Sequence, residues 1–220
     1  MMLTHTRRLR LIQTASSMNE SGLNQGTAGN VSLRVDNGFL ITPSALAYDR
    51  CKPTDVVEMD MHGKVRLGHR RPSSEWRLHR DIFSHRPDAG AVLHAHPPWC
   101  TTLACLEREI PACHYMVAMA GGDRIACAPY GLFGTAELSN NVLAALDNGR
   151  CACLLAHHGM VCYAGDLQEV FALAIEVENL ARVYGQALQI GDVPVLSAGE
   201  MQAVRERFVD YKAISAKSRK

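Results

Sequence analysis

Residues 72–96 read PSSEWRLHRDIFSHRPDAGAVLHAH and contain the two histidines around which the chain is organised. Three apolar residues at 91–93 predict a short buried strand that runs into His94-Ala95-His96. Because side chains alternate faces along a strand, His94 and His96 project from the same face. Two imidazoles on one face begin a metal site but leave a divalent ion short of ligands. Other parts of the chain must supply the rest.

His157 and Glu75 are the predicted additional ligands. His157 follows residues 151–156, an apolar stretch that predicts a second strand, and binding clefts open where such strands end. Glu75 lies in the first turn of a helix predicted to begin at Pro72-Ser73-Ser74, with a serine as its N-cap. A carboxylate in that position can reach a metal held on the adjacent strand. We therefore expect a site of His94, His96, His157 and Glu75, with Zn²⁺ as the default ion.

The composition is that of a soluble globular protein, with 47% hydrophobic and 20% charged residues among 220. A formal net charge of +1 argues against nucleic acid or an anionic membrane as a partner, so we expect a small ligand. The eight cysteines form no CxxC pair, which favours reduced thiols over a disulfide framework. No secretory leader and no apolar run of roughly 18 residues is visible, so we expect a cytoplasmic location.

Helical and strand periodicities share the chain, which predicts an α/β protein, and the length is that of a single domain. We expect an ordered core over about residues 4–211 and a basic tail at 212–220. The predicted helices span 4–21, 72–85, 97–107, 137–147, 166–189 and a last segment from 197; the predicted strands span 31–35, 39–41, 56–61, 65–67, 91–96, 125–129, 151–156 and 161–163.

Two regions are suited to bind an anion such as phosphate. Residues 24–30, NQGTAGN, are rich in glycine and small polar side chains, and the loop at 42–45 follows a predicted hairpin. Ser73 and Ser74 lie at a helix N-terminus, where free N–H groups favour negative charge. The loop at 24–30 matches neither GxxxxGK(S/T) nor GxGxxG, so by itself it is explained better by a plain turn before a hairpin, and capping alone explains the two serines as well as anion binding does.

Beyond these patterns, an ordered set of motifs resembles the class II, zinc-dependent sugar-phosphate aldolase, epimerase and adducin family. The likeness covers residues 22–211 and is strongest to members that act on L-fuculose 1-phosphate. It implies a single three-layer α/β/α domain with a central, mainly antiparallel sheet, assembled as a homotetramer with active sites at subunit interfaces. The motifs are NQGTAGNVS at 24–32, ITPS at 41–44, PSSEWR at 72–77, RPD at 86–88, HAH at 94–96, HYM at 114–116, APY at 128–130 and HHG at 157–159.

The resemblance also implies a role for individual residues. Glu75 becomes both the fourth resting-state metal ligand and the catalytic acid/base. Tyr115, donated across a subunit interface, and Tyr211, near the C-terminus, become catalytic tyrosines. Ala45 departs from the pattern, because the family has glycine there, and its methyl group is expected to bear on which substrate fits. The zinc ligands fall on His94, His96 and His157, and the phosphate pocket falls on Gly29, Asn30, Ser44, Ala45, Ser73 and Ser74.

The expected reaction is the reversible cleavage of a ketose 1-phosphate, similar to L-fuculose 1-phosphate, into dihydroxyacetone phosphate and a small aldehyde. One Zn²⁺ per subunit, with Mn²⁺ or Co²⁺ as possible substitutes, would stabilise the enediolate that the broken carbon–carbon bond leaves behind. Glu75 would manage the proton. The protein is therefore expected to be a class II aldehyde-lyase.

Four alternatives stay open within the same superfamily. One is an aldolase for 5-deoxyribulose or 5-methylthioribulose 1-phosphate in nucleoside salvage, because the aldehyde end of the pocket has no sequence signature. The others are a pentulose-phosphate 4-epimerase, which usually has aspartate in place of Glu75, and a methylthioribulose-1-phosphate dehydratase. The last is a non-enzymatic interaction module of the adducin type, which generally lacks the metal histidines that this chain retains.

Overall fold

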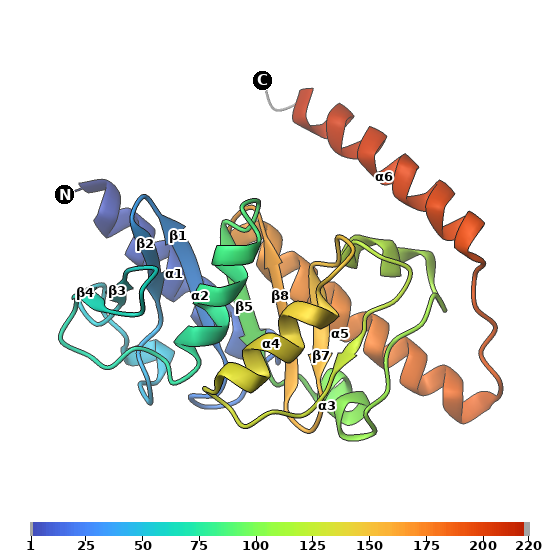
Figure 1. Ribbon diagram of the computed structural model, residues 1–220, viewed down its shortest axis with the longest axis horizontal. Coiled ribbons are helices and arrows are strands. Elements are labelled where there is room, and N and C mark those ends of the chain that lie inside the picture. The colour runs from blue at the N-terminus through green and yellow to red at the C-terminus, as the bar shows by residue number, and fades with distance from the viewer. Residues whose placement is uncertain (1, 218–220) are drawn as a thin grey trace.

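An eight-stranded sheet forms the centre of the computed structural model, which describes the backbone of residues 2–217 and the side chains of residues 4–208 (Figure 1). Its strand order is β4-β3-β2-β1-β5-β8-β7-β6. Neighbouring strands are antiparallel except for β6 and β7, which confirms the mainly antiparallel sheet. The strands are β1 (Asn30–Val35), β2 (Gly38–Ile41), β3 (Val57–Met59), β4 (Val65–Leu67), β5 (Ala91–Ala95), β6 (Cys127–Ala128), β7 (Ala152–Leu155) and β8 (Gly159–Ala164).

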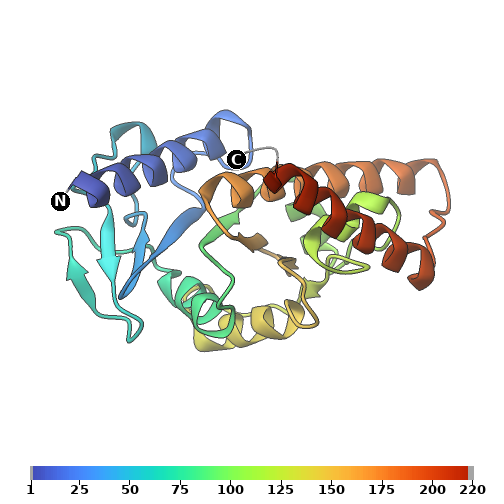
Figure 2. The same ribbon diagram turned by 90° about the horizontal axis from the view of Figure 1, so that it is seen from above.

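Helices cover both faces of the sheet, as the predicted three-layer α/β/α arrangement requires (Figure 2). The core on one face includes side chains of α1, α3 and α5, and the core on the other includes those of α2 and α4. The helices are α1 (Met2–Glu20), α2 (Trp76–His85), α3 (Pro98–Cys105), α4 (Ala136–Ala145), α5 (Leu167–Ile190) and α6 (Ala198–Lys217), with short 3₁₀ helices η1 (Tyr48–Arg50) and η2 (Tyr115–Ala120).

The central strand β5 divides its side chains between these two cores. Residues 91, 93 and 95 pack in the core of α1, α3 and α5, whereas Val92 packs in the core of α2 and α4. Alternation then places His94 on the side of Val92, which is the side of α2. The strand is buried along its whole length. This alternation is the rule from which the sequence analysis placed His94 and His96 on one face.

The starts of α5 and α6 carry the predicted capping residues. Asp166 Oδ1 accepts a hydrogen bond from the Glu169 N–H (2.8 Å). Ser197 Oγ accepts one from the Glu200 N–H (3.3 Å), and Glu200 Oε2 accepts one from the Ser197 N–H (2.7 Å). These bonds satisfy N–H groups that a helix end leaves without an intrahelical partner.

The start of α2 differs from the prediction. The helix begins at Trp76, with Glu75 in the N-cap position and no side-chain capping bond, whereas the sequence predicted a start near Pro72 with a serine cap. Pro72 instead forms an isolated bridge with Pro43, and Ser73 Oγ accepts a hydrogen bond from the Glu75 N–H (3.3 Å). This short non-helical segment frees the Glu75 side chain to turn toward β5.

The last helix, α6, extends away from the sheet at the top right of Figure 1. It includes residues 212–217, which were predicted to form a tail, and residues 218–220 lie outside the described part of the chain. Among the described residues, no helix combines the length and the apolar character needed to cross a bilayer.

Candidate metal centre

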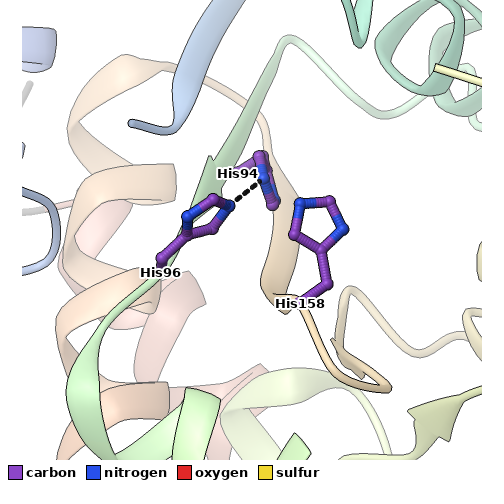
Figure 3. A group of neighbouring side chains, drawn as sticks. All are labelled: His94, His96 and His158. Carbon is purple, nitrogen blue, oxygen red and sulfur yellow. Dashed lines mark hydrogen bonds between the residues drawn. The ribbon is translucent and has the colours of Figure 1, made fainter. Parts of the chain in front are cut away.

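Three imidazoles converge where β5 ends and where the chain turns between β7 and β8 (Figure 3). They belong to His94, His96 and His158, and one ring nitrogen from each lies within 4.8 Å of the other two. His94 Nε2 lies 2.9 Å from His96 Nε2, and the ring centroids are 4.7–4.9 Å apart. His94 is fully buried, and the other two rings are partly exposed, so a ligand can approach from their side.

Glu75 adds a buried carboxylate to this cluster. Its Oε2 atom lies 3.1 Å from His94 Nε2, and its Oε1 atom lies 3.6 Å from His158 Nε2. Burial acts to raise the pKa of the Glu75 carboxyl, but His94, His158 and the amide of Asn30 outweigh it and hold the pKa below its usual value. The carboxylate is therefore ionised at neutral pH. Its expected place beside the histidines is what the structure shows.

The chemistry of these donor atoms fits a divalent cation. His94 Nδ1 donates to the carbonyl of Met160 (2.8 Å), so Nε2 is the His94 atom that faces the cluster and is available to a metal. Burial, and to a smaller extent the neighbouring His94 imidazole, lowers the pKa of both His96 and His158 to about 4, so these two rings are neutral at pH 7 and offer lone pairs. Glu75 Oε1 is buried, and no described residue donates a hydrogen bond to it. Acceptors that face one another without a donor are stabilised by a cation between them.

The prediction of His157 as a metal ligand is wrong, and its neighbour His158 occupies that place. His157 Nε2 lies 3.0 Å from Glu107 Oε1, and half of the His157 side chain is exposed. The prediction extended the strand through Ala156, whereas β7 ends at Leu155 and residues 156–158 form a tight turn with His157 at φ +56°. Strand alternation does not survive such a turn, which directs His157 outward and His158 inward.

The segments expected to bind phosphate lie side by side. The Tyr48 hydroxyl donates to the carbonyl of Gly29 (2.7 Å), which ties the first loop to η1. The Thr42 N–H donates to the carbonyl of Val31 (3.2 Å), and the Thr42 carbonyl accepts from the Ser73 N–H (3.1 Å). Ser44 joins the same group through its N–H, which donates to the carbonyl of Arg71, and Ser74 lies against Gly134. Their binding of phosphate stays a prediction.

Ala45 has a left-handed backbone conformation (φ +54°), which explains why glycine suits this position. Such a conformation costs an L-residue about 1–2 kcal/mol. Glycine avoids this strain, but it also raises the conformational entropy of the unfolded chain, which offsets part of the gain in stability. We expect Ala45→Gly to raise the free energy of unfolding by about 0.5–1 kcal/mol, measured by urea denaturation. Ala47, two residues on and extended (φ −63°, ψ 135°), is the matched control. Ala47→Gly should instead destabilise, and equal signs for the two variants would contradict the explanation.

Of the two predicted catalytic tyrosines, the structure describes the side chain of Tyr115 only. Tyr115 begins η2, is 49% exposed, and has its ring 4.8 Å from that of His114 and 6.3 Å from that of Phe208 on α6. Its catalytic role stays a prediction. Tyr211 belongs to α6, but its side chain lies outside those the structure describes.

Sequence reasoning also missed a buried histidine next to the site. His79, on α2, is fully buried, and its Nε2 atom lies 2.5 Å from Asn30 Oδ1. Its position three residues before Ile82, on the apolar side of α2, was the available signal, because an inward-facing histidine needs polar partners. Nothing in the sequence indicated which partners those are.

A comparison with protein families decides the identity of the fold. The sequence model of one family, the class II aldolase and adducin N-terminal domain, matches residues 9–185. The chain belongs to this family. The class II aldolases of this family are metal-dependent, and the three imidazoles and Glu75 are arranged as a metal site requires.

Relatives in the class II aldolase family cover nearly the whole chain. A 5-methylthioribulose-1-phosphate/5-deoxyribulose-1-phosphate aldolase of Rhodospirillum rubrum is 53% identical over 201 residues, which cover 91% of this chain and 90% of the relative. The L-fuculose phosphate aldolase of Escherichia coli K12 is 49% identical over 203 residues, covering 92% and 94%. A solved L-fuculose 1-phosphate aldolase superposes with a TM-score of 0.89 at 38% identity, covering 92% of this chain and 96% of the other.

Proposed function

We propose that this protein is an aldolase that reversibly cleaves a ketose 1-phosphate into dihydroxyacetone phosphate and a small aldehyde. The observation that carries the proposal is the Glu75 carboxylate, held 3.1 Å from the central imidazole of a three-histidine cluster. The names of the relatives, all aldolases for sugar 1-phosphates, support the same reaction class. An interaction module would have no use for a buried, ionised carboxylate facing three imidazoles.

The proposed cofactor is one Zn²⁺ per subunit, held by His94, His96, His158 and, in the resting state, Glu75. Three neutral nitrogen ligands favour Zn²⁺, although Mn²⁺ and Co²⁺ suit the same donor set less specifically. When bound, the ion supplies a Lewis acid that stabilises negative charge left on the substrate by carbon–carbon cleavage.

Glu75 is the proposed acid/base. Its Oε2 atom is fixed by the Asn30 amide (3.1 Å), whereas Oε1 accepts a hydrogen bond from none of the described residues and so is the atom free to accept and return a proton. Gly29, Asn30, Ser44, Ala45, Ser73 and Ser74 are the proposed surroundings of the phosphate, with Tyr115 and Tyr211 as proposed proton donors.

Two substrates remain for the same reaction. L-Fuculose 1-phosphate is the first, and it follows from the likeness of the motifs. The higher identity to the Rhodospirillum rubrum relative, 53% against 49%, slightly favours a 5-deoxy- or 5-methylthiopentulose 1-phosphate. Both have a phosphorylated C1 and differ at the aldehyde end, so one pocket for phosphate and metal serves either.

A homotetramer in the cytoplasm, with active sites at subunit interfaces, is the proposed working form. One exposed loop after β6 supports an assembly, because it presents Tyr130, Leu132 and Phe133 at 54–61% exposure. Apolar side chains gathered in this way are typical of surfaces that another chain covers.

The test is release of dihydroxyacetone phosphate by the zinc-loaded protein, followed by a coupled NADH assay. The panel contains L-fuculose, 5-deoxyribulose, 5-methylthioribulose and L-ribulose 1-phosphates, with ribulose 5-phosphate added to detect epimerisation. We expect cleavage of at least one ketose 1-phosphate and its loss when a chelator removes the metal. No release from any of them by protein with a full complement of metal would contradict the proposed reaction.

A further inference from the structure

A chain of buried polar side chains leads from the sheet to Glu75. Ser32 Oγ lies 2.6 Å from His79 Nδ1, His79 Nε2 lies 2.5 Å from Asn30 Oδ1, and Asn30 Nδ2 lies 3.1 Å from Glu75 Oε2. Ser32 and His79 are fully buried, and Asn30 and Glu75 are 4% and 6% exposed. Ser32 and Asn30 lie on one face of β1, two residues apart, and His79 extends from α2 between them. Water therefore does not compete for these bonds.

Only one direction of hydrogen bonding satisfies the whole chain. The ionised Glu75 carboxylate accepts only, so the Asn30 amide nitrogen faces it and the amide oxygen faces His79. His79 Nε2 must then carry the ring proton, because Asn30 Oδ1 also only accepts. Burial lowers the pKa of His79 to about 3, so the ring holds a single proton and Nδ1 accepts from the Ser32 hydroxyl. Each donor in the chain thus points toward Glu75.

We propose that His79 is a positioning residue, which fixes the orientation of the Asn30 amide and thereby holds one oxygen of Glu75 in place. The inference rests on the proposed function, in which Glu75 is a metal ligand and the acid/base. The Ser32 hydroxyl donates to His79 Nδ1 and so supports the tautomer that Asn30 requires. Without the imidazole N–H, the Asn30 amide oxygen loses its donor and the amide is free to rotate. In its rotated orientations the amide N–H no longer holds the Glu75 carboxylate oxygen in place.

The position of His79 favours this role over a purely structural one. A structural buried histidine is satisfied by any two partners, whereas His79 has one partner, Asn30, that itself contacts the Glu75 carboxylate, and a second, Ser32, that only supports the tautomer. Bonds in a buried chain of this kind polarise one another, so the distal Ser32 is expected to have a smaller effect of the same sign. Residues that orient a metal ligand in this way typically change metal affinity by 10–100-fold when removed.

The experiment measures metal binding, which needs no substrate. Zn²⁺ affinity is determined by competition with a chromophoric chelator, and the visible absorption of the Co²⁺-loaded protein reports the ligands of the ion. We expect His79→Leu to weaken Zn²⁺ binding by about 10-fold and to shift the Co²⁺ spectrum in the direction of Glu75→Gln. His79→Gln, which keeps an amide N–H for Asn30, should recover affinity to within about threefold of wild type.

Two comparisons separate positioning from plain stability. Ser139→Ala is the matched control, because Ser139 is also fully buried and its hydroxyl donates to Asp81 (2.6 Å) on α2, away from Glu75. It should lower the thermal midpoint and leave metal affinity unchanged. In a Glu75→Gln background, the effect of His79→Leu on affinity should disappear, because the residue acts through that carboxylate.

The proposal fails if His79→Leu lowers only the thermal midpoint, as Ser139→Ala does, or if it weakens metal binding equally in the Glu75→Gln background. Should His79→Leu not fold, Ser32→Ala decides, with an expected loss of about threefold in Zn²⁺ affinity and no loss as the contrary result. A protein that behaves as expected here but cleaves no ketose 1-phosphate would refute the proposed reaction and leave the positioning role of His79 intact.

Discussion

Replacing His158 by alanine is expected to weaken Zn²⁺ binding by roughly 100-fold or more, whereas replacing His157 by alanine should leave it close to wild type. Structural zinc sites with four ligands bind with about 10–16 kcal/mol, so one ligand accounts for about 3 kcal/mol, which is about 100-fold. His158 has its ring in the cluster, but His157 contacts Glu107 and is half exposed. Turnover should fall together with metal occupancy in His158→Ala.

The two variants control for each other, because they are adjacent, have the same composition and change the same turn. Metal content after dialysis and chelator competition give the affinities, and circular dichroism shows whether the turn keeps its fold. Loss of metal in His157→Ala with retention in His158→Ala would reverse the assignment. Equal losses in both would mean that the turn as a whole, and not one ring, determines affinity.

The contrast between these neighbours shows where strand alternation stops predicting side-chain directions. The rule placed His94 and His96 correctly, because His94 lies in β5 and His96 follows directly, without a turn between them. It failed at His157, because the strand before it ends two residues earlier and the φ of +56° there lies outside any strand conformation. Two consecutive histidines followed by glycine leave the choice of ligand to the turn geometry.

The general architecture was legible from sequence for a similar reason. Helical and strand periodicities predicted the α/β class, whereas the three layers and the mainly antiparallel sheet were implied by the resemblance to the family. Boundaries were less accurate, and the strand predicted at 125–129 is reduced to Cys127–Ala128. The bridge between Ile110 and Ile125 shows that the upstream part of this segment pairs with a loop and not with the sheet.

The network around Glu75 was beyond local sequence patterns, because its members are far apart in the chain. Asn30 and Glu75 are separated by 45 positions, and Ser32 and His79 by 47. Nothing in the loop at 24–30 distinguishes an asparagine that faces a phosphate from one that faces a carboxylate. The pairing of β1 with β5 makes the difference, since it sets Asn30 opposite His94. Only the assembled sheet shows that the side-chain amide of Asn30 donates to Glu75.

Glu75→Gln is expected to lower kcat by about 10³-fold while the protein keeps much of its metal. General acid–base catalysis by one side chain contributes about 10²–10⁴-fold, and glutamine has the size of glutamate without a titratable proton. The three imidazoles remain as ligands, so a moderate loss of affinity is expected, and saturating Zn²⁺ compensates for it. The measurement is single-turnover cleavage of the substrate found in the panel, at full occupancy by metal analysis.

Glu178→Gln is the control, because it makes the same chemical change at another carboxylate that accepts from backbone. Glu178 Oε1 and Oε2 each accept an N–H at the start of α3, from Trp99 and Cys100 (2.9 Å each). Losing that charge should lower the free energy of unfolding, since a carboxylate at a helix N-terminus interacts favourably with the helix dipole. The kcat should stay within a few-fold of wild type. If Glu75→Gln turned over at the wild-type rate with metal bound, Glu75 would be a ligand only. The proton would then have to be carried by another group at the site, and the tyrosines at 115 and 211 would be the next to test.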